Sequence, residues 1–462
     1  MEEQEMIMVQ GYEVKQGYVL HLGGHKYAPG GTVLETLPKS VIENQGWKIQ
    51  PTVIVKPAPV PLIPPRDMRH PVTLKDGAWA GRRCFILGGG PSLAGVDISR
   101  LEGELTIGIN RALELLDPTM IFSMDSRFYM WLRSGEFGQE VIRKYVDSPA
   151  WKIWMNTHGF KFGPEVQTIE ATDLPRGLSI HDGITQGANS GLMALKVAVA
   201  LGADPIYLLG FDLHPNGKFQ KWWHDGYKYV QKDSVYESFL EEFEAFAPEA
   251  EKRGVRVTNC NPDSALRCFE FGEMPAPTPG PLFISCFTPG LYTEKAKTLR
   301  LSLHRLGLDY RLVQVEDRGS WDANTKQKAE FILLMMETTG RDVVWLDADA
   351  IVRSYPDLFW NIEGDVALHY RNRQELLSGT MFFRNNRRSR SLLKSWIKEN
   401  ENNPEEWDQL ILQRVIESKR GVWAPRIHHL PATYCQIFDS MKEAGEPVVE
   451  HFQASREAKR LP

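Results

Sequence analysis

Short hydrophobic runs alternate with longer segments that carry apolar residues at helical spacing along most of the chain. In the C-terminal part this pattern predicts strands at 281–287, 310–316 and 343–346 and helices at 293–308 and 325–340. The strands are apolar throughout, which is typical of parallel strands buried on both faces. Their alternation with helices predicts a doubly wound α/β sheet.

The middle part of the chain shows the same rhythm. Strands are predicted within 82–93, 105–113, 119–129, 205–213 and 254–262, and an apolar helix within 190–203. The first 50 residues alternate and are rich in turns, which predicts a small β-rich module with a short helix ending at Gly46. We therefore expect two doubly wound Rossmann-like domains plus this module.

Two proline-rich stretches separate these parts and are expected to be extended spacers. The predicted organisation is a β-rich module, a spacer, a first α/β domain, a second spacer and a second α/β domain, at 1–50, 51–66, 67–273, 274–281 and 282–462.

Composition narrows the functional classes. The chain has 462 residues, 42% apolar content and a formal net charge of -5. This balance argues against a protein that coats nucleic acid through general basicity. No apolar stretch reaches the roughly 20 residues of a membrane span, and the acidic start lacks the order of a signal peptide. The five cysteines form no C-x-x-C pair, so neither disulfides nor zinc are indicated and a cytoplasmic location is expected.

The strongest candidate chemistry follows the strand at 343–346, which ends in Asp347 and Asp349. Ligands of open α/β sheets bind where strands end at the carboxyl edge. Two acids there cost solvation energy unless a positive group lies between them, and their spacing lets both reach one hard divalent cation. A cation so held can bridge a diphosphate, as in a nucleotide-sugar transferase. The alternative is a chance D-x-D in a helix cap or a solvated turn.

A series of segments supports the first interpretation by its order. The C-terminal part resembles the GT-A fold nucleotide-sugar glycosyltransferases in Thr288-Pro289-Gly290, the helix with Lys326 and Lys328, WLDADAIV, LSGTMFFRNN, EEWDQLILQRVI and VEHFQASR. The resemblance implies that Asp347 and Asp349 bind a metal and the donor diphosphate. It implies that His451 completes the metal site, for which Mn²⁺ suits imidazole better than Mg²⁺.

The same resemblance implies further roles. Ser378, Gly379 and Thr380 would form a loop beside the donor sugar, and Asp408 would be the base or an acceptor anchor. Arg456, Lys459 and Arg460 would neutralise the diphosphate. The alternatives are a surface role for His451, an N-cap role for Asp408, and a solvated face for the lysines of 325–340. The basic run Arg384, Arg387, Arg388, Arg390 and Lys394 is either a solvated face or a contact for an anionic acceptor.

The middle part carries a second candidate site in LGGGPSL, where amides of Gly88, Gly89 and Gly90 and the next helix start can approach a phosphate. With GINRA, SMDSRFY, ANSGLMAL, LLGFDL and WWHDGY, this segment resembles the bacterial sialyltransferases and their relatives, the archaeal hydroxymethylpterin pyrophosphokinase and flagellin-modifying families. The resemblance implies nucleotide contacts from the glycines and from Ser92, Asn110, Ser190 and Gly191, and a general base at His224.

One departure and one alternative accompany this resemblance. The sialyltransferases have asparagine where Gly89 stands, which leaves the donor open. His224, beside Trp222, Trp223 and Tyr227, would alternatively only cap an aromatic cluster.

The N-terminal module resembles modules common in bacteriophage structural and accessory proteins, which implies a phage origin, a docking role and the host cytoplasm as location. Three functions follow: a glycosyltransferase with two active sites, a single GT-A transferase with a nucleotide-binding module, or a non-enzymatic phage adaptor. The expected partners are nucleotide sugars and an acceptor that is either a hydroxymethylated DNA base, a glycan or a protein.

Overall fold

The computed structural model describes residues 73–156, 159–173, 177–214, 222–224, 227, 233–278 and 280–458. Of the first 72 residues it describes only the strands β1 (Met6–Val14), β2 (Leu20–Leu22), β3 (His25–Tyr27), β4 (Val33–Leu34) and β5 (Ile49–Pro57). By their internal contacts, residues 1–62 and 131–143 form one compact unit and the remaining residues a second. The first unit contains the sheet β4-β1-β5 and the hairpin β2-β3. Residues 51–57 of the predicted spacer are extended and pair with β1, and the helix predicted to end at Gly46 lies outside the described residues.

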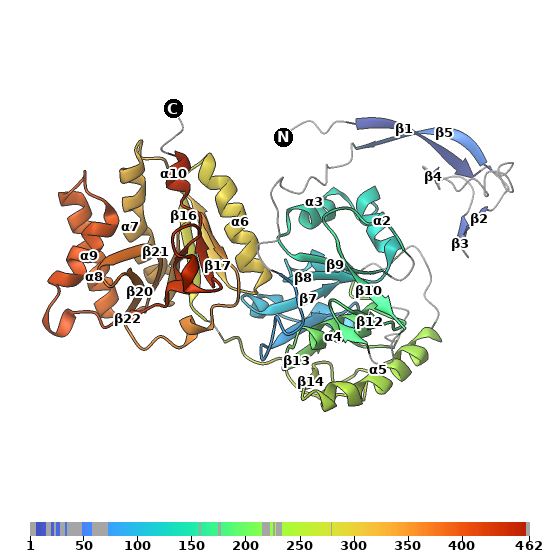
Figure 1. Cartoon of the computed structure of the whole chain (residues 1–462). Coiled ribbons are helices and arrows are strands. Elements are labelled where there is room, and N and C mark those ends of the chain that lie inside the picture. Colours follow the sequence, from blue (N-terminus) through green and yellow to red (C-terminus); the bar gives the residue numbers. More distant parts are fainter. Residues whose placement is uncertain are drawn as a thin grey trace. The chain divides into compact units, whose positions relative to one another are not determined.

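A sheet of ten strands forms the middle part of the chain (Figure 1), in the order β11-β12-β10-β9-β8-β7-β6-β13-β14-β15. Only β11 runs antiparallel to its neighbour. The strands are β6 (Cys84–Leu87), β7 (Leu105–Ile109), β8 (Met120–Ser123), β9 (Trp151–Asn156), β10 (Gln167–Thr172), β11 (Leu178–Ser179), β12 (Gly183–Thr185), β13 (Ile206–Leu209), β14 (Val257–Asn259) and β15 (Glu270–Phe271). Because the chain order runs outward from β6 on one side and from β13 on the other, the two strands form a topological switch point.

The helices of this part are α2 (Ser126–Ser134), α3 (Gln139–Asp147), α4 (Ser190–Ala200) and α5 (Val235–Lys252). The predicted apolar helix is α4, which packs on β6, β7 and β8 and begins where the Asn189 side chain accepts a hydrogen bond from the amide of Leu192. The helix start predicted directly after the glycine-rich turn is not an α-helix. Residues Pro91–Gly95 form a single 3-10 turn, which ends as the backbone becomes extended at Val96.

A sheet of six strands forms the C-terminal part, in the order β17-β16-β18-β21-β20-β22. Parallel pairing of β16 (Leu282–Phe287) with β17 (Tyr310–Gln314) and β18 (Val343–Leu346) confirms the predicted strand–helix alternation. Beyond it lie β20 (Val366–Arg371), β21 (Glu375–Phe383) and β22 (Ile427–His429), and a separate small sheet contains β19 (Ala350–Val352), β23 (Gln436–Ile437) and β24 (Val449–His451).

Five helices accompany this sheet: α6 (Leu291–Arg305), α7 (Trp321–Thr339), α8 (Arg387–Asn402), α9 (Asp408–Ser418) and α10 (Ala454–Ala458). Helix α7 begins four residues before the predicted start, because the Ser320 side chain accepts a hydrogen bond from the amide of Ala323 and caps the helix. Its end at Gly340, in the left-handed conformation, agrees with the prediction. None of the described helices has the length and apolar character needed to cross a bilayer.

Candidate functional sites

A cavity of about 450 Å³ opens at the carboxyl edge of β16 and β18. The two strands are neighbours, and the chain leaves them toward opposite sides of the sheet: β16 is followed by β17 on one side, and the next strand of this sheet after β18 is β20 on the other. The cavity therefore lies at a switch point of this sheet. Its lining includes Asp347, Asp349, Ser378 and Asp408 from the predicted set. The structure therefore brings together side chains that lie up to 61 positions apart in sequence.

The carboxylate of Asp347 is held by a residue of the preceding strand and by a lysine of α7. Its Oδ1 accepts a hydrogen bond of 2.9 Å from the indole Nε1 of Trp345, a residue two positions earlier on the same face of the strand. The same oxygen lies 3.1 Å from the Nζ of Lys328. Both described partners engage Oδ1, so Oδ2 is the oxygen available to a ligand.

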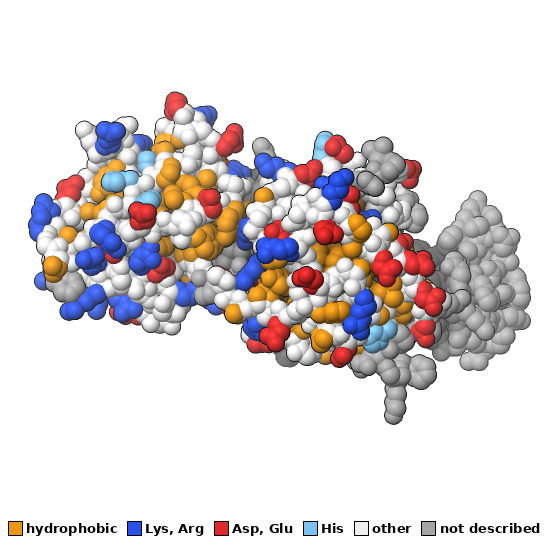
Figure 2. Space-filling model, turned by 90° about the horizontal axis from the view of Figure 1, so that it is seen from below, with side chains coloured by type: hydrophobic (Ala, Val, Ile, Leu, Met, Phe, Trp, Pro, Cys, Tyr) orange, Lys and Arg blue, Asp and Glu red, His pale blue; other side chains and the backbone are white. Residues whose placement is uncertain are grey.

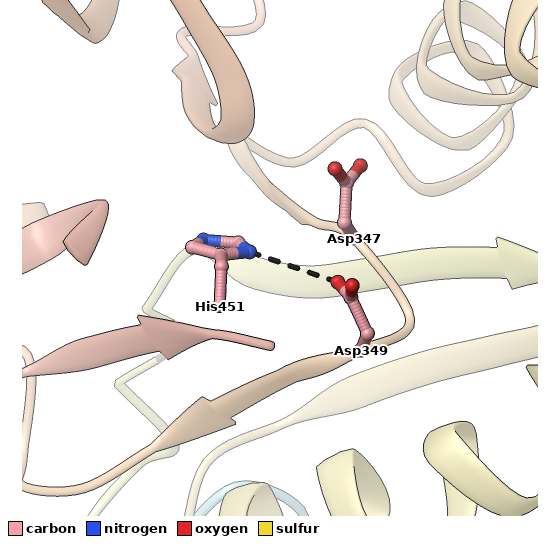
Figure 3. Close-up of side chains that lie close together, drawn as sticks. All are labelled: Asp347, Asp349 and His451. Atoms are coloured by element: carbon pink, nitrogen blue, oxygen red, sulfur yellow. Dashed lines mark ion pairs between the residues drawn. The ribbon is translucent and has the colours of Figure 1, made fainter. Parts of the chain in front are cut away.

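Asp349 is held by the C-terminal segment. Its Oδ2 accepts a hydrogen bond of 2.6 Å from the backbone amide of Ala454, at the start of α10, and its Oδ1 lies 3.9 Å from Nδ1 of His451. Burial alone would raise the pKa of this carboxyl, but the hydrogen bonds and charge of His451 and the Ala454 amide hold it below its ordinary value. Figure 3 shows Asp349 turned toward the His451 ring.

His451 is buried, with 3% of its surface exposed, so the surface role considered for it is wrong. It reaches the site because β24 pairs with β19, directly after the two acids. Its Nε2 lies 2.8 Å from the hydroxyl of Thr380. Burial lowers its pKa, but hydrogen bonds to Asp349 and to Cys435 outweigh burial and raise it to about 10.

Gly379 is required by this histidine. A Cβ at position 379 would lie 2.8 Å from Cε1 of His451, closer than side chains approach one another. Ser378 and Gly379 lie within strand β21, so the predicted loop is wrong, and the close approach at Gly379 is made by the His451 ring in this structure.

The three side chains fit a divalent cation. One ligand atom from each of Asp347, Asp349 and His451 lies within 4.8 Å of the others. Ligands on opposite sides of one Mg²⁺ ion lie about 4.2 Å apart, since each bond is about 2.1 Å, so a small movement closes the set. Each ligand group has its second polar atom engaged by the protein, as is usual around metal sites. Two carboxylates and an imidazole suit Mn²⁺.

Lys328 lies between the metal ligands and Asp408. Its Nζ lies 3.4 Å from Oδ2 of Asp408 and 3.1 Å from the hydroxyl of Ser378. Only 6% of its surface is exposed, so the solvated face considered for the lysines of α7 is wrong for it. It is also wrong for Lys326, which is buried and donates to the carbonyl of Asn403 at 2.8 Å.

Asp408 is the first residue of α9 and does not cap it, because the N-cap position belongs to Trp407. Its side chain is buried beside Lys328. Burial and the charge of Asp347 raise its pKa, and Lys328 opposes them only in part. A carboxyl with a raised pKa is suited to accept a proton near neutral pH.

The basic groups predicted to contact the diphosphate or an anionic acceptor differ from one another in where they lie. Arg456 lines the cavity and is paired with Asp439, whereas Lys459 and Arg460 lie outside the described residues. In the basic run, Arg388 of α8 is paired with Asp365, and Arg384, which precedes α8, donates to the carbonyl of Gly364. No residue of this run is among the described residues that line the cavity.

A second cavity, of about 620 Å³, lies at the switch point between β6 and β13. Its lining includes the predicted residues Gly88, Gly89, Gly90, Asn110, Ser190, Gly191 and His224. Ser92 is not among them. Its hydroxyl donates to Oδ2 of Asp212 at 2.7 Å, so the structure gives it a role in holding the turn.

The glycines of the turn serve packing as well as access. A Cβ at Gly90 would lie 1.9 Å from Oδ2 of Asp212, and one at Gly88 would lie 2.6 Å from the carbonyl oxygen of Gly210. The turn is thus pressed against the loop that follows β13. Gly89 is the least crowded of the three, with Cδ1 of Trp222 at 3.4 Å.

Two asparagines supply polar atoms to this cavity. Among the described residues, Oδ1 of Asn110 and Nδ2 of Asn189 are buried without a hydrogen-bond partner, a condition that costs free energy unless a ligand or water relieves it. Asn110 also has a left-handed backbone, with φ of 52°, and such strain is typical of functional positions. Asn189 caps α4, so the N-terminus of an 11-residue α-helix opens on the cavity.

His224 lies with its Nδ1 3.3 Å from Nη1 of Arg111. Because a guanidinium only donates, Nδ1 accepts and the proton of the neutral ring belongs on Nε2. This ring also stacks on Trp222, with centroids 6.0 Å apart, so it is part of the aromatic cluster as well as of the cavity.

Sequence analysis missed several residues of both sites. Arg111 directly follows the predicted site residue Asn110, and Trp345 shares a strand face with Asp347. Both could therefore have been predicted from their positions in the sequence. Thr380 was expected beside the donor sugar, but its contact with His451 was not predicted. The Ala454 amide reaches Asp349 only through long-range pairing, for which the sequence carries no local signal.

Residues 324–458 match the family model described as nucleotide-diphospho-sugar transferase. The C-terminal part of the chain thus carries a domain of this class, which supports glycosyl transfer as the activity and a nucleotide sugar as the donor. No curated protein matches the chain.

Three solved structures are similar to parts of the chain. A glycosyltransferase involved in glycosylation of the major capsid of PBCV-1 is 14% identical, with 39% of this chain and 97% of that one covered and a TM-score of 0.32. The apo glycosyltransferase GlyE of Streptococcus pneumoniae TIGR4 is 15% identical, with 38% of this chain and 55% of that one covered and a TM-score of 0.29. The sialyltransferase CST-II in complex with CMP is 16% identical, with 42% of this chain and 87% of that one covered and a TM-score of 0.27.

Proposed function

We propose that the protein is a metal-dependent glycosyltransferase that uses the cavity at β16 and β18, with Asp347, Asp349 and His451 holding the cation. The observation that carries the proposal is the convergence of these three ligand groups within 4.8 Å, in a family-matched segment. A divalent cation bound there would stabilise the negative charge that develops on the leaving diphosphate.

The chain's own residues define the remaining steps. Trp345 and Lys328 fix the orientation of Asp347, and Ala454 fixes that of Asp349. Asp408 is placed on the far side of Lys328, where it accepts the proton of the acceptor hydroxyl or anchors the acceptor.

The test is a donor screen with the whole protein. Nucleotide release from UDP-, GDP-, CMP- and dTDP-sugars is measured with Mn²⁺ and with EDTA. We expect release that requires Mn²⁺ and that falls at least 100-fold in D347N and in D349N. The exposed acid Glu363 provides a matched control, because E363Q should keep wild-type turnover. Release that still requires Mn²⁺ and persists in both aspartate variants would refute the assignment.

We also propose that the cavity at β6 and β13 binds a nucleotide, as part of a second, sialyltransferase-like site in a separate α/β domain. The unpartnered Asn110 and Asn189 atoms and the start of α4 favour this function. Loss of one nucleotide-binding event in N110A, with Mn²⁺-dependent release intact, would support it. If CMP, CDP and UDP all bind N110A and wild type equally, this site is wrongly assigned.

A further inference from the structure

Two tryptophans form a corner in the cavity that holds Asp347 and Asp349. Trp321 is the first residue of α7 and Trp407 the N-cap of α9, with ring centroids 6.0 Å apart and ring planes at 72°. Trp407 keeps 47% of its surface exposed. Large exposed aromatic side chains beside a cavity are typical of binding surfaces.

Helix formation does not explain these residues. Trp407 occupies an N-cap position, where serine, threonine, aspartate and asparagine are preferred, and its side chain makes no capping hydrogen bond. Trp321 is oriented by a side-chain hydrogen bond with Tyr292, which also lines the cavity. Positions that break a local rule without a structural gain are expected at functional sites.

The charges of the cavity argue against a polyanionic acceptor. Its described lining contains three cations, Lys328, Arg371 and Arg456, against four acids, Asp347, Asp349, Glu375 and Asp408. Each cation is paired with an acid: Lys328 with Asp347, Arg456 with Asp439 and Arg371 with Glu375. Nucleic-acid binding depends on surplus positive charge that neutralises phosphates.

The wider surface agrees with this balance. Figure 2 shows basic and acidic side chains interspersed on the face that it displays. The basic run at 384–394, the other candidate contact for an anion, is engaged in part by Asp365 and by backbone carbonyls.

We propose, on the basis of the proposed transferase function, that the acceptor is a neutral saccharide whose ring lies on Trp407 in the corner formed with Trp321. One of its hydroxyl oxygens forms the new bond to the anomeric carbon of the donor sugar. The bond from that carbon to the diphosphate breaks and its electron pair stays on the nucleotide. The hydroxyl proton passes to Asp408, the residue directly after Trp407.

The test uses the full chain, Mn²⁺ and each nucleotide sugar that it consumes. The acceptors are methyl β-lactoside, methyl β-cellobioside and methyl β-maltoside, a DNA duplex containing 5-hydroxymethylcytosine, and a serine-rich peptide, with products identified by mass. We expect at least one glycoside to gain a sugar. Its KM should rise at least tenfold in W407A and less than threefold in W407F, which retains a ring, while kcat changes less than KM.

Leu410, an exposed apolar residue on the same helix, supplies the matched control, because L410A should keep the wild-type KM. W321A gives a second, independent reading if W407A does not fold. The saccharide proposal is overturned if the donor is consumed but only DNA or peptide, or none of the glycosides, is modified, or if W407A and W321A leave the KM within twofold. If no nucleotide sugar is consumed at all, the proposed function itself fails and this inference fails with it.

Discussion

Replacing Lys328 by methionine removes the one cation that separates two carboxylates. Its Nζ lies 3.1 Å from Asp347 and 3.4 Å from Asp408. At an effective dielectric constant of about 20, each attraction is about 5 kcal/mol, and the desolvation of the ammonium offsets much of it. The side chain of Asp347 is 37% exposed, so water screens that pair and its net contribution is about 1 kcal/mol or less.

The pair with Asp408 decides the magnitude. Lys328 and Asp408 have side-chain exposures of 7% and 6%, and removing one partner of such a pair leaves an uncompensated buried charge. We therefore expect K328M to lower the free energy of unfolding by about 3–5 kcal/mol at pH 7. Methionine is unbranched like lysine and lacks only its terminal ammonium group, so packing along the rest of the side chain changes little.

The assay is urea unfolding of K328M and of K394M at pH 7 and pH 5. Lys394 pairs with Glu337 at 3.9 Å on the surface, with 65% and 47% of the side chains exposed, so K394M should change stability by less than about 0.5 kcal/mol. Burial raises the pKa of Asp408, and loss of Lys328 raises it further. Protonation of Asp408 as the pH falls should therefore reduce the deficit of K328M. Equal stabilities of the two variants at pH 7 would refute the buried-pair argument.

The remaining predictions concern His451, Gly379 and Asn110. Because the pKa of His451 is raised to about 10, Mn²⁺ must displace its proton, and the affinity for Mn²⁺ should rise about tenfold per pH unit between pH 6.5 and 8.5. Calorimetry in two buffers should show that one proton is released, and an affinity that does not change with pH would exclude His451 as a ligand. The same histidine stabilises the metal-free fold fully below its unfolded pKa of about 6.5, and this contribution is lost as the pH rises through about 10. G379A, whose Cβ would lie 2.8 Å from the His451 ring, should weaken Mn²⁺ binding at least tenfold by calorimetry, while G95A, with open space around it, should not. N110G should keep the left-handed backbone and the Tm but lower nucleotide affinity in the β6–β13 cavity about tenfold by fluorescence titration, and unchanged affinity would exclude the side chain as a contact.

The strands that carry both sites were predictable because each is a short apolar run followed by polar residues. Predicted strand 343–346 is β18, and Asp347 and Asp349 do follow it at the cavity. Helix α7 was placed too late because the capping serine at 320 was overlooked. The domain boundaries and the roles of the site residues stay predictions.

The environment of the charged residues was not predictable from local pattern. Lysines spaced along α7 look like a solvated face, but α7 packs against α8, α9, β16 and β18, and Lys326 and Lys328 lie on the packed face. Burial of Lys328 depends on that packing and on Asp408, 80 positions later. The 3-10 turn after the glycines likewise depends on Asp212, which holds Ser92 from another strand.

The position of Lys328 also explains how Asp347 and Asp408 can both stay ionised at the sheet edge when no metal is bound. Without a positive neighbour, Asp347 and Asp408 would repel each other, and one of them would take up a proton. Lys328 prevents this by engaging Oδ1 of Asp347 and Oδ2 of Asp408, while His451 compensates Asp349. In the proposed metal-bound state, a cation held by Oδ2 of Asp347 would leave the lysine contact in place but would have to displace the proton of His451. The lysine would then stay in the site whether or not a metal is bound, whereas the charge on the histidine would be exchanged for that of the metal.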